Sequence, residues 1–443
     1  ETTEAFDVSG LSLNTKTLTK GDLFIALQGE KNHGAEYIDS AIENGCIGVL
    51  IEGRDVDCGV PIIRIDKLKL YLSRLAQNFY TKAKDVDLIA VTGTNGKTSV
   101  SHYISQLLDF LEVNNGVIGT LGISKVEKKS INTTPDIFSI YSSLEEYSSQ
   151  GIKLAIIETS SHALMQDRLE GLSFVQGIFT NLTQDHLDYH ETMGNYKEAK
   201  GKLFTNGFSK KAIINRDDEY HQYYIETASD KDLLTFGIDD LEFLKASENG
   251  FICQLNNYVF ELPLIGEFNL SNALAAFTSV KCLGYSEDQI IPFLAKLYPP
   301  PGRMQQLENS HIWIDYAHTP DALDNALASL RTHYPEFKIR VLFGCGGDRD
   351  KTKRQLMGKI ASENADSIIL TNDNPRSESP EKIIEDILGG IKVENDVQVI
   401  LDRKHAIETA VKTLGEYEVL LIAGKGHETT QTIGDQIFQF SDV

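Results

Sequence analysis

A short glycine-containing run between an apolar segment and an amphipathic one constrains this chain more than any other feature. Leu88–Val91 is apolar, Thr92-Gly-Thr-Asn-Gly-Lys-Thr-Ser99 follows, and apolar residues then recur at helical spacing from Val100 to Leu111. A strand, a glycine turn and a helix in this order aim backbone N–H groups and the positive end of the helix dipole at one point, where an anion binds. The sequence therefore predicts a phosphate-binding loop.

Two side chains of this loop suit a nucleotide triphosphate. Lys97 adds a full positive charge, and Thr98 can place its hydroxyl on the Mg²⁺ that accompanies ATP. The loop departs from the strict G-x-x-x-x-G-K-[ST] pattern, because residue 91 is Val and the first glycine is Gly93. The alternative is a surface turn that contains Gly-Lys-Thr by chance, and the flanking strand and helix disfavour it.

A carboxylate follows a second apolar run. Leu154–Ile157 predicts a buried strand, and Glu158 stands at its carboxyl end, where open α/β sheets bind their ligands. We expect Glu158 to bind Mg²⁺ through oxygen. The alternative is a helix N-cap or an ordinary loop acid.

Composition excludes several classes of protein. The chain has 443 residues, 42 Lys and Arg against 64 Asp and Glu, and a net charge of −22, which disfavours nucleic-acid and polybasic membrane-surface binding. No apolar run approaches the ~18–20 residues of a spanning helix, and no basic, apolar leader begins the sequence. The 5 cysteines include no C-x-x-C pair, so we expect reduced thiols in the cytoplasm.

Apolar runs alternate with helical patterns along most of the chain, which predicts the α/β fold class with mostly parallel sheets covered on both faces. The expected strands are Ile47–Ile51, Leu88–Val91, Leu154–Ile157, Ala212–Ile214, Ile312–Ile314, Val341–Phe343, Ser367–Leu370 and Val419–Ala423. Boundaries are expected near residue 85, in a charged stretch, and at Pro299-Pro-Pro-Gly302, a stiff helix-breaking segment. The predicted domains are 1–85, 86–302 and 303–443.

The motifs together resemble the Mur ligase family, the ATP-dependent amide-bond ligases of peptidoglycan precursor synthesis. The resemblance spans essentially the whole chain. Its motifs, in order, are Thr92–Ser99, Glu158-Thr-Ser-Ser-His162, Asp185-His-Leu-Asp-Tyr-His190, Tyr196 with Ala199-Lys200, Gly266-Glu-Phe-Asn-Leu-Ser-Asn272, Pro301-Gly-Arg-Met304 and Asp315-Tyr-Ala-His-Thr-Pro320.

The resemblance implies three domains: an N-terminal uridine-nucleotide-binding domain, a central P-loop ATPase-like domain and a C-terminal Rossmann-like domain that binds the incoming amino acid. Three further motifs are similar to the branch that joins meso-diaminopimelate to UDP-N-acetylmuramoyl-L-alanyl-D-glutamate. They are Gly346-Gly-Asp-Arg349, Asp373-Asn-Pro-Arg376 and Gly424-Lys-Gly-His-Glu428. A monomer is expected, with no nucleic-acid partner and no membrane insertion.

The resemblance also implies the ATP site. Its expected contacts are Thr94, Asn95, Gly96, Lys97, Thr98, Ser99, Asn272, Arg303 and Asp315. Two Mg²⁺ ions are expected, one on Thr98 and Glu158 and the other on His186 and a CO₂-derived carbamate of Lys200. A lysine reacts with CO₂ only when neutral, so the site must lower its pKa. The alternative for Lys200 is an ordinary solvated helix lysine, as we expect for Lys197.

The remaining candidate residues are expected to contact one or the other of the two substrates. By resemblance, the muramoyl dipeptide contacts are Leu13, Thr15, Asn132, Thr133, Thr134, Ser160, Gln166 and Arg168. The diaminopimelate contacts are Arg349, Asp373, Asn374, Pro375, Arg376, Gly424 and Glu428. On chemical grounds, the Arg376 guanidinium can bind the distal carboxylate of diaminopimelate through two hydrogen bonds. The Glu428 carboxylate can accept a hydrogen bond from the distal ammonium. In the N-terminal domain, Asn14-Thr-Lys16 stands where the family has Asp-Ser-Arg.

Some residues are given a structural interpretation or a general role. Trp313 is expected to be a core residue, His102 and His311 to be structural or solvated, and His318 and His427 to orient ligands. A local cluster of cations is expected to offset phosphate charge in this acidic chain. Its members are Arg340, Arg349, Lys351, Lys353 and Arg354.

Four other functions stay open at the sequence level. Two are ligases of the same superfamily, the lysine-adding branch and a folate-polyglutamylating enzyme, although the folate group usually has Gly where Thr98 stands. A P-loop NTPase switch or motor would hydrolyse nucleotide without an acceptor amino acid, and the chain lacks the Asn-Lys-x-Asp guanine motif. A non-catalytic nucleotide-binding module would not need Lys97, Glu158 and Lys200 together.

Overall fold

The computed structural model describes residues 7–29, 32–126, 132–205, 207–308 and 310–443. These residues form two compact units. The first lies within Glu1–Ala90, Asn114–Gly177 and Thr205–Lys210, and the second comprises Val91–Val113, Ile178–Phe204 and Lys211–Val443. No helix in the described ranges is both long and apolar enough to cross a membrane.

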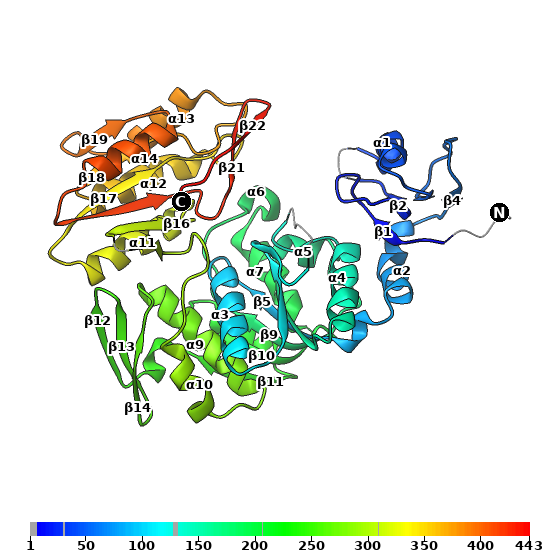
Figure 1. Ribbon diagram of the computed structural model, residues 1–443, viewed down its shortest axis with the longest axis horizontal. Helices are drawn as coiled ribbons and strands as arrows, with labels where there is room; N and C mark the ends of the chain where they lie inside the picture. The colour runs from blue at the N-terminus through cyan, green and yellow to red at the C-terminus, as the bar shows by residue number, and fades with distance from the viewer. Residues whose placement is uncertain (1–6, 30–31, 127–131, 206, 309) are drawn as a thin grey trace. The chain divides into compact units, whose positions relative to one another are not determined.

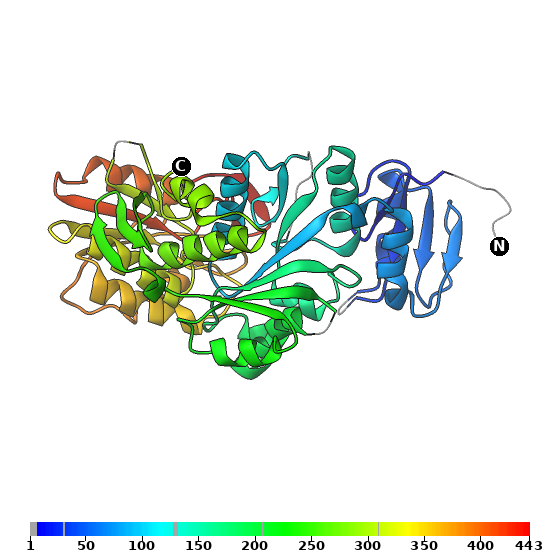
Figure 2. The ribbon, with the colours of Figure 1, turned by 90° about the horizontal axis from the view of Figure 1, so that it is seen from below.

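The N-terminal part of the first unit is a four-stranded sheet in the order β1-β2-β3-β4 with only parallel pairings, and Figure 2 shows its strands in blue. The strands are β1 (Gly10–Ser12), β2 (Asp22–Ala26), β3 (Gly48–Ile51) and β4 (Ile62–Arg64). The helices here are α1 (Ile38–Glu43), α2 (Leu72–Phe79) and the short 3₁₀ turns Gly34–Tyr37, Leu68–Tyr71 and Ala83–Asp85. Phe24, Val49 and Ile51 face Ile38 and Ala41 in its core.

A seven-stranded sheet follows in the order β11-β10-β9-β5-β8-β6-β7. Its strands are β5 (Asp87–Thr92), β6 (Asn115–Gly119), β7 (Gly122–Ile123), β8 (Leu154–Glu158), β9 (Phe174–Phe179), β10 (Ser209–Asn215) and β11 (Asp232–Phe236). The intervening helices are α3 (Lys97–Phe110), α4 (Ile137–Ser149), α5 (Ser161–Met165), α6 (Leu187–His190), α7 (Met193–Gly201) and α8 (His221–Thr227), with 3₁₀ turns at Lys202–Phe204 and Ile238–Asp240. The strand before the phosphate loop, β5, is therefore an interior strand.

The second unit adds a small antiparallel sheet in the order β12-β13-β14 and two helices, labelled in Figure 1. The strands are β12 (Phe243–Ser247), β13 (Gly250–Leu255) and β14 (Tyr258–Leu262), and the helices are α9 (Glu267–Cys282) and α10 (Glu287–Leu294). Helix α9 packs along α3, the helix that begins at the phosphate loop. This contact places Asn272 beside the loop at Gly96, and Asn269 accepts from the Tyr103 hydroxyl of α3 at 3.1 Å.

The C-terminal sheet has the order β15-β16-β20-β17-β18-β19 and is parallel except for β15. Its strands are β15 (Gln305–Gln306), β16 (Ile312–Asp315), β17 (Lys338–Phe343), β18 (Ser367–Leu370), β19 (Asp396–Val399) and β20 (Glu418–Ala423). Its helices are α11 (Pro320–His333), α12 (Thr352–Asn364), α13 (Pro380–Leu388) and α14 (Arg403–Lys412). The hairpin β21 (Thr430–Ile433) and β22 (Gln436–Gln439) follows β20, and a short segment to Val443 comes after it.

Alternating residues of this sheet enter two separate cores. Val419 and Leu421 pack with residues of α11, α12 and α13, whereas Leu420 and Ile422 pack with Ala406 and Ala410 of α14. Successive strand residues point to opposite faces, so the two clusters lie on opposite sides of the sheet. Both faces are covered, as continuous apolar strands require. Trp313 is 4% exposed and belongs to the first core, which confirms the structural interpretation.

All eight expected strands are present, and the expected α/β class with mostly parallel sheets is confirmed. The antiparallel sheet β12–β14 and the hairpin β21–β22 were not expected. Parallel strands place their carboxyl ends on one edge of a sheet, where ligands bind. The segments that leave β16, β17, β18 and β20 at that edge begin at Tyr316, Gly344, Thr371 and Gly424.

Candidate active site

The phosphate loop joins β5 to α3 with two glycines in special conformations. Gly93 has φ 155° and Gly96 has φ 85°. A Cβ at Gly93 would overlap the Thr180 hydroxyl, and one at Gly96 would overlap the Asn272 side-chain oxygen. Only glycine permits both the left-handed backbone and this close approach. The loop therefore presents backbone N–H groups at the start of a helix, as the sequence predicts.

The segment after β9 fixes the loop. The Thr94 and Asn95 N–H groups donate to the Asn181 backbone oxygen and side-chain oxygen at 2.8 and 2.9 Å. The Thr94 hydroxyl accepts from the Thr183 N–H at 3.0 Å and shares a hydrogen bond with the Tyr196 hydroxyl at 3.2 Å. These bonds set the loop's shape before any ligand arrives.

Two lysines converge on one carbonyl of this loop. Lys97 Nζ donates to the Gly93 and Thr94 carbonyls at 2.8 and 2.9 Å, and Lys200 Nζ donates to the same Gly93 carbonyl at 2.7 Å. Lys200 is 1% exposed, and its Nζ lies 4.4 Å from the Tyr196 ring centroid. Burial, and then the charge of Lys97, hold the pKa of Lys200 well below its usual value. The solvated-lysine alternative is therefore wrong for Lys200.

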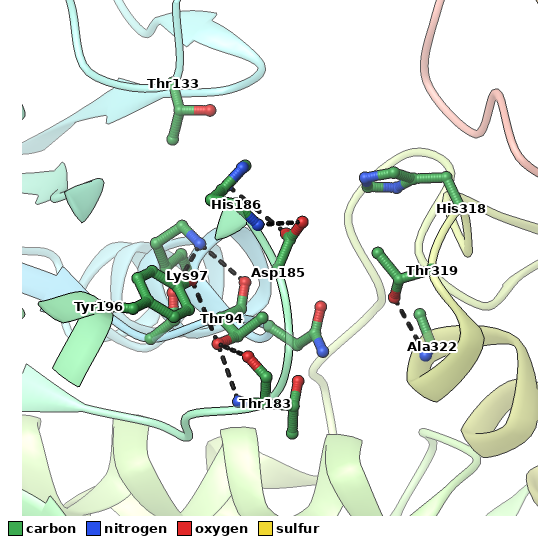
Figure 3. A network of polar contacts seen from close by, with 12 residues as sticks. Thr94, Lys97, Thr133, Thr183, Asp185, His186, Tyr196, His318, Thr319 and Ala322 are labelled. Atoms are coloured by element: carbon green, nitrogen blue, oxygen red, sulfur yellow. Dashed lines mark hydrogen bonds and ion pairs between the residues drawn. The ribbon is translucent and has the colours of Figure 1, made fainter. Parts of the chain in front are cut away.

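Asp185 and His186 lie near Lys97, and His318 stands on the facing segment (Figure 3). His186 begins α6 with φ 54°, and its Nε2 is 3.5 Å from an Asp185 carboxylate oxygen. Burial raises the pKa of Asp185, but His186, His318 and Lys97 outweigh it and the net pKa lies below the usual value. Burial also lowers the pKa of His318, whose Nδ1 is 2.9 Å from the Tyr316 carbonyl. The lowered pKa values favour the ionised carboxylate of Asp185 and the neutral imidazole of His318.

Three residues carried over as nucleotide contacts lie close to the loop. Arg303 Nη2 is 3.5 Å from the Thr98 hydroxyl, and its guanidinium lies 4.6 Å over the Tyr316 ring. Asp315 accepts from the Met304 N–H at 2.7 Å. Burial raises the pKa of Asp315 to about 6, although the Arg303 charge opposes this. Asn272 meets the loop at Gly96.

We expect Asp315→Asn to change the pH dependence of stability in a defined direction. The folded-state pKa is about 6 against 3.8 for the unfolded carboxyl, so the folded protein binds more protons in this window and loses stability as pH rises through it. The amide lacks this titration. The thermal midpoint of the variant minus that of wild type should therefore increase between pH 4 and pH 7. The corresponding change in the difference between their free energies of unfolding is at most about 3 kcal/mol. A midpoint difference independent of pH would contradict the assignment.

One residue that the sequence analysis did not select, Asp321, also holds the loop. Asp321, in the first turn of α11, accepts from the Asn95 side-chain amide at 2.9 Å and from the Thr183 hydroxyl at 3.4 Å. The Thr319-Pro320 start of a helix was visible in the sequence. Its approach to Asn95 was not, because the two residues are distant in the chain.

In the first unit, Glu158 ends β8 and is fully buried. Its two oxygens accept from the Thr120 N–H at 3.0 Å and the Thr120 hydroxyl at 2.8 Å. A Cβ at Gly119 would overlap this carboxylate. The bonds to Thr120 hold the Glu158 carboxylate in a fixed orientation at the end of β8.

The candidate dipeptide residues of this unit form one network around Thr134. The Thr134 hydroxyl donates to the Glu158 carbonyl at 2.7 Å and lies 3.1 Å from the Ser160 hydroxyl, and Arg168 Nη1 donates to the Thr134 carbonyl at 2.7 Å. Gln166 accepts from Arg168 at 2.5 and 3.1 Å. The remaining candidates extend this network or lie elsewhere in the unit. Thr133 meets Thr120 at 3.1 Å, Asn132 is exposed, and Leu13 and Thr15 are half-buried beside β1.

The expected diaminopimelate residues come from adjoining loops. Glu428 accepts from the Asn374 amide at 2.9 Å and from Lys425 Nζ at 2.8 Å. Arg376, with φ 52°, donates from Nη1 to the Gly347 carbonyl at 2.6 Å.

The glycines allow the loops to approach one another. A Cβ at Gly424 would be 2.8 Å from Asp373, and one at Gly347 would overlap the Pro375 carbonyl. Arg349, which donates to its neighbour's carbonyl at 3.1 Å, is exposed. The structure therefore brings these candidates into one region of the second unit.

The expected cation cluster is wrong for Arg340 and Arg354. Arg340 donates to Glu418 at 2.8 Å. Arg354 is fully buried, makes bonds to both oxygens of Glu378 at 2.9 and 3.1 Å, and also reaches Asp386. Charges neutralised in this way do not offset phosphate charge. The sequence showed the cations but not the carboxylates that fold against them.

The oxygen-bearing residues fit a bound Mg²⁺ in their chemistry, since a threonine hydroxyl and a buried glutamate carboxylate supply the oxygen ligands that this ion prefers, whereas the His186 imidazole is a less usual ligand for it. Within the described ranges, no three His, Cys, Asp or Glu side chains gather as a metal site. Each expected ligand set contains only one residue of these four types, because Thr98 is combined with Glu158 and carbamylated Lys200 with His186. Neither set is therefore a group of that kind.

Comparison with known proteins assigns the family. The Mur ligase family catalytic-domain model matches residues 7–80, the Mur ligase middle domain 91–280, and the Mur ligase glutamate ligase domain 302–426. The chain therefore belongs to the Mur ligases, ATP-dependent enzymes that form amide bonds.

Individual relatives show which Mur ligases this chain resembles over nearly its whole length. The chain is 39% identical over 98% of its length to the UDP-N-acetylmuramoyl-L-alanyl-D-glutamate--2,6-diaminopimelate ligase of Coxiella burnetii, covering 94% of that protein. It is 37% identical to the protein of the same name from Alkaliphilus oremlandii, with 98% and 93% covered. A solved structure with that name is 33% identical, with a TM-score of 0.65 over 98% of this chain and 93% of the other.

Proposed function

We propose that this chain joins meso-diaminopimelate to the D-glutamate carboxylate of UDP-N-acetylmuramoyl-L-alanyl-D-glutamate, at the expense of ATP, in peptidoglycan precursor synthesis. The observation that carries the proposal is the full-length similarity, at 37–39% identity, to ligases whose names give both substrates. The assembled loops around Arg376 and Glu428 support the choice of amino acid.

The chemistry explains why ATP is needed. A carboxylate oxygen is a poor leaving group, so an amine does not displace it in water. Transfer of the γ-phosphoryl group to that oxygen releases ADP and gives an acyl phosphate. The amine then attacks the acyl carbon, an amide forms, and phosphate leaves with one former carboxylate oxygen while the amine loses a proton. Cations must offset the repulsion between carboxylate and triphosphate.

We assign the phosphates of ATP to the loop. The N–H groups of Gly96 to Ser99 and the ammonium of Lys97 would bind them, while Thr94 and Asn95, whose N–H groups donate to Asn181, would line the site. This requires Lys97 to exchange its bonds to the Gly93 and Thr94 carbonyls for phosphate oxygens. Arg303 would add a second cation, and Asn272 and Asp315 would contact the rest of the nucleotide.

We assign one Mg²⁺ to Thr98 and Glu158, and a second to His186 and carbamylated Lys200. Bound there, the ions would neutralise charge on the phosphoryl group as it transfers. The low pKa of Lys200 supports the carbamate, because CO₂ adds only to a neutral amine and releases a proton in doing so. Lys200 is also fully buried, so its charged form is costly to keep.

We assign the acceptor amino acid to Arg349, Asp373, Asn374, Pro375, Arg376, Gly424 and Glu428. Arg376 would bind the distal carboxylate and Glu428 the distal ammonium of diaminopimelate. Lysine lacks that carboxylate and would leave the half-buried guanidinium without an anion, which penalises lysine. The UDP-muramoyl dipeptide would contact Leu13, Thr15, Asn132, Thr133, Thr134, Ser160, Gln166 and Arg168. Monomeric state and cytoplasmic location stay predictions.

Phosphate release from ATP in the presence of the UDP-muramoyl dipeptide tests this proposal. We expect strong stimulation by meso-diaminopimelate and little by L-lysine. Equal or greater stimulation by lysine would assign the chain to the lysine-adding branch. Release that is indifferent to both amino acids would indicate an NTPase and overturn the ligase.

A further inference from the structure

A fully buried ion pair lies in the C-terminal part of the chain. Arg403 begins α14, and Asp442 lies in the segment after β22. Arg403 Nε donates to one carboxylate oxygen of Asp442 at 2.7 Å, and Nη2 donates to the other at 2.6 Å. Both side chains are 0% exposed. The pair is bidentate, which fixes the guanidinium in position and orientation.

The same guanidinium bonds two strand ends. Nη2 donates to the Ala423 carbonyl at 3.0 Å and Nη1 to the Asn372 carbonyl at 3.3 Å. Ala423 is the last residue of β20, and Asn372 follows β18 by two residues. Asp373 and Gly424 come next in the sequence. One side chain therefore joins the starting points of two of the loops that carry the acceptor candidates, those after β18 and β20.

Charge links Arg403 to the same loops. Burial alone would lower the pKa of Arg403, but the carboxylates of Asp442, Asp373 and Glu428 outweigh it and the guanidinium stays charged. The positive charge of Arg403 therefore lies close enough to Asp373 and Glu428 to attract both carboxylates.

Stability alone does not explain this arrangement. Replacing a buried ion pair with apolar residues is often neutral or stabilising, because desolvation offsets the attraction. A buried pair whose remaining donors hold two functional loops is better explained by orientation.

We propose that Arg403 is a positioning residue of the acceptor amino-acid site, and that Asp442 anchors it there. The inference rests on the proposed function, since it takes Asp373 and Glu428 as acceptor contacts. In this proposal the segment after β22 supports the acceptor site through Arg403, and Asp442 does not itself contact the amino acid.

Asp442→Asn tests the proposal, because the amide keeps the shape of the carboxylate and removes its charge. We expect the KM for meso-diaminopimelate to rise about 10- to 100-fold, with the KM values for ATP and the UDP-muramoyl dipeptide within about twofold of wild type. Arg403→Lys, which keeps the charge but loses the fork, should raise the same KM.

Glu418→Gln is the matched control. Glu418 pairs with Arg340 at 2.8 Å, is itself only 21% exposed in its side chain, and lies at the opposite end of β20 from Ala423. We expect all three KM values of this control within about twofold of wild type. Thermal midpoints of each variant measure the separate effect on stability.

Three outcomes would count against the inference. The first is that Asp442→Asn and Arg403→Lys match the control in all KM values, the second is that they raise all three KM values equally, and the third is that both fail to fold. Each result would assign the pair to stability. Wild-type phosphate release that is indifferent to diaminopimelate would be a different failure, because it would overturn the proposed function itself.

Discussion

Lys200→Ala is expected to lower kcat by at least about 10³-fold, because the account gives this side chain a ligand role at the phosphoryl group. ATP binding should remain within a few-fold of wild type, since Lys97 and the backbone of the phosphate loop are unchanged. Steady-state rates and a direct ATP titration measure the two effects separately. We give Lys200 this role because its side chain is fully buried and its Nζ lies 2.7 Å from the Gly93 carbonyl of the loop.

Lys197→Ala is the matched control, because Lys197 lies on the same helix, is only half-buried and contacts the Tyr223 ring at 4.3 Å. It should turn over at nearly the wild-type rate. Carbon NMR of wild-type protein in ¹³CO₂-enriched buffer should show a carbamate signal that Lys200→Ala lacks and Lys197→Ala keeps. Near-normal turnover of Lys200→Ala would contradict the carbamate assignment.

Arg376→Ala is expected to lower kcat/KM for meso-diaminopimelate by about 10²–10³-fold, because the distal carboxylate would lose a charged, hydrogen-bonded partner. The kcat/KM for lysine, which has no such carboxylate, should fall much less. The ratio of the two values should therefore shift toward lysine. Competition assays with both amino acids, followed by mass analysis of the products, measure this ratio directly.

Lys382→Gln provides a control for general loss of positive charge, because Lys382 is exposed on α13, which follows the Arg376 loop. Its selectivity should equal that of the wild type. An Arg376→Ala protein that keeps the wild-type preference for diaminopimelate would show that another cation reads the distal carboxylate. Arg349, exposed beside the same loops, would then be the next residue to test.

Local patterns in the sequence were sufficient for the fold class and the phosphate loop. The run Ser367–Leu370 predicts β18 with its observed bounds, and the apolar spacing after Ser99 predicts α3. These predictions succeed because strand and helix periodicities depend on near neighbours. The antiparallel sheet β12–β14 was missed, because its strands are short and mix apolar with polar residues, which gives a weaker apolar signal.

Contacts between distant segments could not be predicted in the same way. Nothing local to Arg354 shows that Glu378 and Asp386 neutralise it, and nothing near Asn95 indicates Asp321. The burial of Lys200 also depends on packing between α7 and the phosphate loop. The resemblance identified Lys200, and the structure adds the physical reason that its pKa is low.

Isotope transfer from the dipeptide tests the central claim, amide formation through an acyl phosphate. UDP-muramoyl dipeptide labelled with ¹⁸O in its D-glutamate carboxylates is incubated with ATP and meso-diaminopimelate, and the phosphate and peptide are analysed by mass. The account predicts one ¹⁸O in each released phosphate and one tripeptide product per phosphate. Unlabelled phosphate released without tripeptide would contradict it, because water rather than the carboxylate would then have attacked ATP.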